Sequence, residues 1–132
     1  MSEKARRESI GCSENQAMFE LSEVTNPFRL MHLARLVVNE IHRLLDRSRP
    51  RLVNQDQLRE CCSSITANIR EAYGRPEGPD RDRFLRYAKS SAEESDERLR
   101  TNFANGRLPA KTYWQLRDRL VVISRIIDAL IS

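Results

Sequence analysis

The C-terminal segment of the chain carries its most regular apolar pattern, and this pattern constrains the fold more than any other feature. Apolar residues recur there at alternating spacings of three and four, at Tyr113, Leu116, Leu120, Ile123, Ile127 and Leu130. This repeat is typical of one helical face packed against other helices. A second apolar set lies beside it: Trp114, Val121, Val122, Ile126, Ala129 and Ile131. Because a helix in an isolated bundle needs only one such stripe, the surplus indicates a subunit interface or a central position in the monomer.

Three more helical segments precede this one, and each ends at a Gly or Pro break. The first should begin at Pro27, with Asn26 as its N-cap, and run to about Ser48. The second should start after Pro50 and end at Tyr73, with Gly74 as a left-handed C-cap. The third should extend from about 80 to 104, with Asp80 as its cap, and Gly106 and Pro109 should separate it from the fourth.

Composition and connection lengths then define the expected architecture. Only 4 Gly and 5 Pro occur in 132 residues, 39% of residues are hydrophobic, and alternating β-branched runs are absent. Because short connections make sequential helices antiparallel neighbours, we expect an all-α, up-down-up-down four-helix bundle over residues 26–132. Residues 1–25 are polar and lack sustained periodicity, so they are predicted to be a flexible N-terminal extension.

The positive charge of the chain belongs to the predicted bundle. Residues 26–132 contain 20 Lys and Arg against 14 Asp and Glu, a net charge of +6, whereas residues 1–25 carry a net charge of −2. Nearly all of these cations are arginines, whose planar guanidinium suits phosphate recognition. The candidate nucleic-acid contacts lie at the start of the third helix, at Arg81, Arg83, Arg86 and Lys89. The alternative is a solvated face that Asp80, Asp82 and Glu93 partly neutralise.

Metal, cofactor and membrane functions find no support in the sequence. Cys12, Cys61 and Cys62 do not have metal-ligand spacing, and His32 and His42 have no Cys or carboxylate at a distance that completes a site. We therefore expect no cofactor and no metal. No signal peptide and no apolar run of membrane-spanning length occurs, so we expect a cytoplasmic protein.

A polar stripe interrupts the apolar face of the second helix. It comprises Ser64, Asn68, Glu71 and Arg75, and Ser91 and Glu94 stand at matching positions on the third helix. Polar groups that pack between helices need partners. We expect these groups to bond to one another and to fix the register of the helical hairpin, with a ligand pocket as the alternative.

One weak signal points to an enzyme. Arg35 and His42 lie seven residues apart on one helical face, and this pair loosely resembles the Arg and His signature of the HEPN ribonucleases. The resemblance would imply metal-independent cleavage of RNA. The chance alternative is strong, because the chain contains many arginines and the pair lies among aliphatic residues.

A composite pattern in the second and third helices resembles a known bacterial family. It combines Ser64-Ile65, Asn68-Ile69, Glu71 and Tyr73-Gly74-Arg75 with Phe84-Leu85, Ala88, Ser91 and Glu94. The family is the bacterial four helix bundle proteins, which include proteins encoded by intervening sequences in large-subunit ribosomal RNA genes and the accessory variability determinants of diversity-generating retroelements. The resemblance implies a ring-like homopentamer. For the retroelement members, the resemblance implies that a reverse transcriptase and nucleic acid are the partners.

These observations predict a non-enzymatic, oligomeric helical protein that binds RNA, DNA or a nucleic-acid enzyme through a basic surface. The alternative is a scaffold or assembly protein that contacts only other proteins, and the remote alternative is the metal-independent ribonuclease. A continuous basic face favours nucleic acid, whereas mixed charge favours the scaffold.

Overall fold

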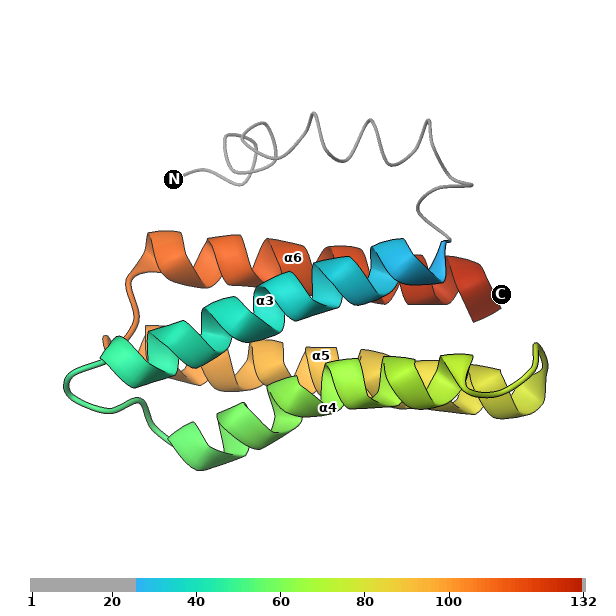
Figure 1. Ribbon diagram of the computed structural model, residues 1–132. Coiled ribbons are helices and arrows are strands. Elements are labelled where there is room, and N and C mark those ends of the chain that lie inside the picture. Colours follow the sequence, from blue (N-terminus) through green and yellow to red (C-terminus); the bar gives the residue numbers. More distant parts are fainter. Residues whose placement is uncertain (1–25, 132) are drawn as a thin grey trace.

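Four helices make up most of the part of the chain that the structure describes. The computed structural model describes residues 26–131, and its helices carry the labels of Figure 1. Helix α3 is Pro27–Arg47, α4 is Gln55–Tyr73, α5 is Pro79–Ala104 and α6 is Ala110–Ile131. The extension predicted over residues 1–25 lies outside the described residues.

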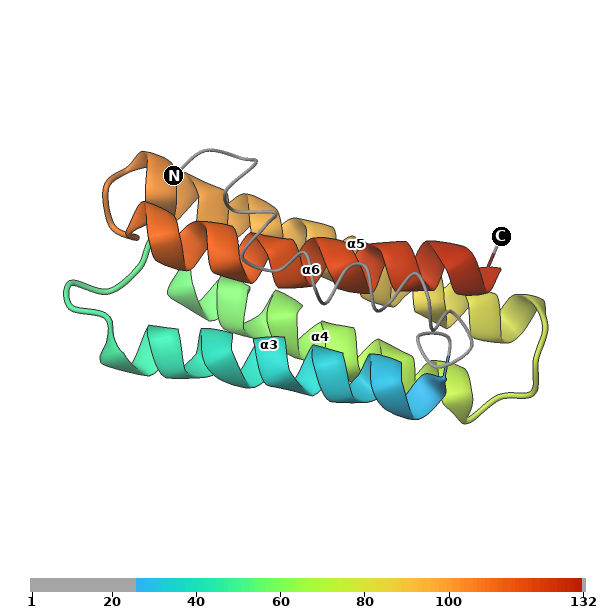
Figure 2. The same cartoon turned by 90° about the horizontal axis from the view of Figure 1, so that it is seen from above.

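The helices form an antiparallel bundle with the predicted order. Helix α3 packs against α4 and α6, and α5 packs against the same two helices from the other side. Figures 1 and 2 show that the start of α3, the C-terminal end of α6 and the α4–α5 turn lie at one end of the bundle. The predicted all-α four-helix bundle is confirmed.

The first helix starts as its sequence predicts. The Oδ1 atom of Asn26 accepts a hydrogen bond of 2.9 Å from the backbone N–H of Phe28. Pro27 occupies the first helical turn, where a missing N–H costs nothing. Helix α3 therefore has a defined N-terminus, which fixes the rotation of all the following residues.

Two predicted helix starts and the conformation of one predicted C-cap differ in the structure. Gly74 is right-handed, with φ −80°, because its N–H bonds to the carbonyls of Arg70 and Glu71 and a left-handed residue is not needed there. Asp80 is not the cap of α5, since Gly78 holds that position with φ 148°. Helix α4 begins at Gln55 instead of directly after Pro50, and left-handed Asn54 precedes it. Gly106, predicted as the C-cap of the third helix, follows the C-cap Asn105 and is left-handed, with φ 74°.

The core lies on the inner faces of all four helices. Its largest fully buried side chains include Leu30, Ile41, Leu58, Ile65, Ile69, Leu85, Leu99 and Tyr113. Burial of each such aliphatic side chain contributes about 1.5–3 kcal/mol. On α6, the predicted stripe is buried from Tyr113 to Ile127, while Leu130 is half-buried. Of the second apolar set only Ile126 is buried, and Ala129 is exposed.

Within residues 26–131, no helix combines the length and the apolar character that crossing a membrane requires.

Candidate nucleic-acid interface

The four cations predicted as nucleic-acid contacts lie in the first three turns of α5, and three of them already have partners. Arg83 Nη2 lies 2.8 Å from Asp80 Oδ1, and Lys89 Nζ lies 2.7 Å from Asp128 Oδ1 of α6. The hydrogen bond to Asp128 raises the pKa of Lys89 above its ordinary value. Arg81 donates two hydrogen bonds to the carbonyl of Arg75. A phosphate would have to compete with the carboxylates that hold Arg83 and Lys89.

Arg86 is the exception among the four predicted cations. It is exposed, and no ion pair holds it within the described residues. Its neighbours along the helix are acidic as well as basic, since Asp80, Asp82 and Glu93 occupy the same helix. The start of α5 is thus a surface of mixed charge.

The outward face of α3 has the opposite character. Arg29, Arg35, Arg43 and Arg47 are all exposed, and within residues 26–131 none of them forms an ion pair. At about 100° per residue, the four fall within an arc of about 120°, on the side opposite the buried residues of α3. They extend over about 27 Å of helix. We call these four residues the α3 arginine face.

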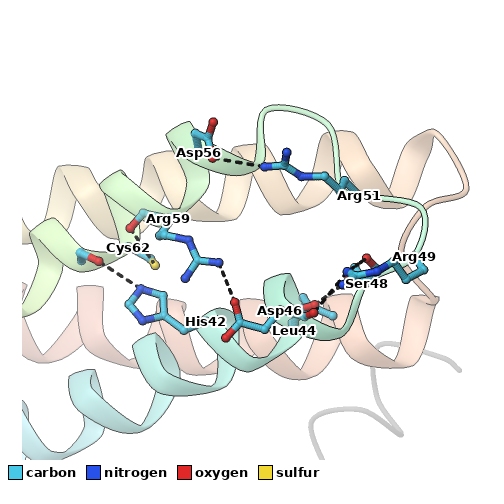
Figure 3. A network of polar contacts seen from close by, with 10 residues as sticks. His42, Leu44, Asp46, Ser48, Arg49, Arg51, Asp56, Arg59 and Cys62 are labelled. Atoms are coloured by element: carbon cyan, nitrogen blue, oxygen red, sulfur yellow. Dashed lines mark hydrogen bonds and ion pairs between the residues drawn. The ribbon is translucent and has the colours of Figure 1, made fainter.

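The acidic residues of α3 do not neutralise this face. Glu40 forms an ion pair with Arg119 of α6, and Asp46 pairs with Arg59 of α4 at 2.9 Å. Figure 3 shows Arg59 extending from α4 toward Asp46, with His42 also directed toward α4. Both carboxylates of α3 are therefore compensated by neighbouring helices, which leaves the four arginines as its excess charge.

Two apolar side chains accompany the α3 arginine face. Phe28 is 84% exposed and Leu36 is 49% exposed, which makes them two of the three most exposed large apolar residues in the described chain. Tyr87 of α5 is the third. An exposed aromatic ring beside guanidinium groups can stack on an unpaired base, so it suits single-stranded nucleic acid as well as a protein surface.

The predicted polar lock between the second and third helices was wrong in its partners. Asn68 donates to the carbonyl of Ser64 at 2.8 Å, and Ser64 donates to the carbonyl of Glu60. Arg75 binds Glu71 on its own helix and Asp80 after the turn. On α5 the Ser91 carbonyl accepts from Ser95, while Glu94 pairs with Arg98.

The reason for this difference is the position of the stripe. Ser64 and Asn68 are half-buried and Glu71 is exposed, so the stripe follows the margin of the α4–α5 contact and not its centre. A carbonyl one turn away is closer to these short side chains than the facing helix is. One polar contact that does join the two helices is between Cys61 Sγ and Ser95 Oγ, at 3.3 Å.

Other polar groups, which the sequence did not single out, join the elements of the bundle. The amide of fully buried Asn102 on α5 binds both the N–H and the carbonyl of Val53, in the α3–α4 connection, at 2.7 and 3.2 Å. Tyr113 of α6 donates to Asp96 of α5 at 2.9 Å and accepts from Arg100 at 3.1 Å. Burial raises the pKa of the Tyr113 hydroxyl. Tyr113 belongs to the regular apolar stripe of the sequence, whereas no pattern in the sequence singled out Asn102.

The two residues considered for catalysis have different surroundings, and the Cys62 thiol is buried. His42 Nε2 lies 3.0 Å from Ser63 Oγ of α4, whereas Arg35 is exposed on α3. Burial raises the pKa of the Cys62 thiol to about 12, so at neutral pH it is an uncharged thiol and a poor nucleophile. In the described part of the chain, His, Cys, Asp and Glu form no group of three that could hold a metal ion.

Taken together, these features define a basic, all-α four-helix bundle protein. The chain belongs to the 23S rRNA-intervening sequence protein family, whose model matches residues 27–129. The resemblance inferred from the polar pattern of α4 and α5 is thereby confirmed.

Solved structures support the same fold. A crystal structure of a protein of unknown function from the S23 ribosomal protein family of Bacteroides thetaiotaomicron is similar, with a TM-score of 0.67 and 22% sequence identity. The match covers 83% of this chain and 98% of that chain. Among curated proteins, none matches the chain significantly.

Proposed function

We propose that this protein binds RNA or DNA electrostatically through the α3 arginine face and does not catalyse a reaction. One observation carries the proposal. Arg29, Arg35, Arg43 and Arg47 point away from the core on one helical face, and no carboxylate within the described residues pairs with them. Unpaired guanidinium groups in a row attract phosphates and release counterions on binding.

The charge balance of the whole bundle supports this proposal. Residues 26–132 carry a net charge of +6, and the ion pairs of α5 and α6 compensate many of their cations locally. Helix α3 contributes 4 − 2 = +2 to this balance, and its four arginines lie together on one exposed face. A basic stripe of this kind steers a polyanion toward one side of the molecule at a rate that falls as salt increases.

A titration of labelled oligo-uridine and of a structured RNA tests the proposal. Binding of oligo-uridine should be detectable at about 50 mM salt and should weaken by about 50-fold at ~200 mM, because four phosphate contacts on a single strand give a log–log slope of about 3. Absence of binding at low salt would overturn the proposal. Binding of equal strength at both salt concentrations would overturn its electrostatic mechanism.

The proposal includes self-association. The family resemblance implies a homopentamer, and a ring would multiply the α3 arginine face. Helix α6 has apolar side chains that another subunit can contact, because Val121 and Val122 are half-buried and Ala129 is exposed. Light scattering should give five times the chain mass, and Val122→Glu should lower it. A wild-type protein with the mass of one chain would contradict this part of the proposal.

A protein partner is the second candidate, and exposed Phe28 and Leu36 favour it. Such apolar side chains within a basic face suit an acidic protein surface, and a reverse transcriptase is the partner that the family resemblance implies. Phe28→Ser with Leu36→Ser distinguishes the candidates. The double variant should retain most of its affinity for oligo-uridine if phosphates provide the binding, and should lose a protein partner if apolar contact does.

A further inference from the structure

A hollow of about 310 Å³ lies at the end of the bundle where α3 begins and α6 ends. The α4–α5 turn and the last turn of α6 form its walls. Its lining residues are Tyr73, Glu77, Gly78, Arg81, Asp82, Leu85, Leu130 and Ile131. The hollow thus combines an aromatic ring, a guanidinium, two carboxylates and three aliphatic side chains.

Arg81 is held in a fixed orientation in this hollow. Its Nε and Nη2 atoms both donate to the carbonyl of Arg75, at 3.1 and 2.7 Å. Its Cζ atom lies 4.8 Å from the centre of the Tyr73 ring. Because one edge of the guanidinium is bound and Tyr73 supports it, its plane is positioned before any ligand arrives.

We propose that this hollow binds a purine base of single-stranded RNA or DNA, with guanine preferred. The proposal rests on nucleic-acid binding by the α3 arginine face and adds a site that recognises a base. A flat ring fits between aliphatic side chains and a positioned Arg and Tyr pair, which is the usual environment of an unstacked base.

The polar groups of the hollow favour guanine over the other bases. The carboxylates of Glu77 and Asp82 are acceptors, and guanine presents two adjacent donors, N1–H and N2–H, to a single carboxylate. The N–H groups of Arg81 that do not bind Arg75 can donate to the guanine acceptors O6 and N7. Uracil offers only one N–H donor and cannot make the paired contact.

A set of labelled oligo-uridines that differ at one central position tests the inference. The position carries uracil, cytosine, adenine or guanine, and affinities are measured at one salt concentration. Guanine should tighten binding about tenfold relative to uracil, and adenine and cytosine should change it by less than about threefold.

Matched variants assign the preference to the hollow. Glu77→Gln with Asp82→Asn, and separately Tyr73→Leu, should abolish the guanine preference. Asp56→Asn with Glu60→Gln removes the same charge from exposed positions on α4 and should leave the preference intact.

Each outcome distinguishes this inference from the proposed function. Binding of all oligonucleotides with no preference for guanine overturns the inference and leaves the proposed function in place. A guanine preference that survives in both hollow variants places recognition elsewhere and also overturns the inference. Failure of every oligonucleotide to bind overturns both.

Discussion

Helices α3 and α5 lie across the bundle from each other, and both carry several cations, but these cations meet different surroundings. On α5, Arg98 and Arg100 have carboxylates one turn away, and Lys89 binds Asp128 of α6. On α3, the four arginines of the arginine face have no carboxylate partner within residues 26–131, because Glu40 and Asp46 pair with other helices.

The comparison shows that the number of cations in a segment does not determine its potential. The acidic residues between them and the partners on neighbouring helices decide how much charge remains for a ligand. The cations of α5 mainly support the bundle. Those of α3 form no ion pair within residues 26–131, and we propose that they bind nucleic acid. Substitution of the α3 arginines should therefore reduce nucleic-acid binding, whereas substitution of the α5 cations should reduce stability.

The largest expected effect concerns affinity. Replacement of Arg29, Arg35, Arg43 and Arg47 by Gln should weaken oligo-uridine binding by more than about 100-fold at ~0.1 M salt, because each lost phosphate contact costs about fivefold there. The unfolding free energy should change by less than about 1 kcal/mol, since exposed side chains contribute little. Fluorescence anisotropy and urea denaturation measure the two quantities.

A matched variant on α5 provides the contrast. Replacement of Arg83, Arg86 and Lys89 by Gln also removes cations, but it should weaken oligo-uridine binding by less than about fivefold, because these charges lie across the bundle from the α3 arginine face and are screened. Equal losses in the two variants would eliminate the distinction between the helices.

The second effect concerns stability. Asn102→Leu should lower the unfolding free energy by about 2 kcal/mol, because the N–H and carbonyl of Val53 lose their partner in a half-buried setting. Oligo-uridine affinity of the folded protein should not change. Gln115→Leu, at an exposed position of α6, is the control and should be nearly neutral.

The third effect concerns pH. Burial raises the pKa of Cys62 from its ordinary value of 9.0 to about 12, so the unfolded chain releases this proton before the folded chain does. Its contribution to stability is complete below pH 9 and is lost as pH rises toward 12, by about 1.4 kcal/mol per pH unit. Urea denaturation under reducing conditions should show a flatter alkaline decline for Cys62→Ala. Parallel declines in the two proteins would contradict this assignment.

The smallest effect tests a single pair on α5. Lys89→Gln breaks the contact with Asp128, and exposed pairs of this kind contribute about 0.2–1 kcal/mol. Thermal unfolding should therefore change slightly, and affinity for oligo-uridine should change by less than about twofold. A large loss of affinity would show that Lys89 contacts nucleic acid and would contradict this expectation.

The sequence predicted most of the fold because its dominant signals are local. The apolar spacing of α6, the Asn26-Pro27 start of α3 and the Gly106 break all depend on residues close together in the chain. The end of α4 at Tyr73 with Gly74 as its C-cap was right, but the left-handed conformation of Gly74 and the cap of α5 were wrong, because a five-residue turn has several ways to satisfy the same carbonyls.

The candidate site was less predictable, because it depends on contacts between helices. The cluster Arg81 to Lys89 was visible in the sequence, but the pairing of Lys89 with Asp128 joins residues of α5 and α6. The α3 arginines are spread over about five turns and become one face only when the core side of the helix is known. The sequence contained this signal, since apolar residues and arginines fall on opposite sides of α3. It becomes visible only when each residue is assigned its position around the helix.

The salt dependence of oligo-uridine binding tests the central claim most directly. The slope of log Kd against log salt should fall by about 3 in the variant that lacks the four α3 arginines, since each phosphate contact on a single strand contributes about 0.7. The slope of the α5 variant should remain that of the wild type. A slope that is unchanged in the α3 variant and reduced in the α5 variant would contradict the account.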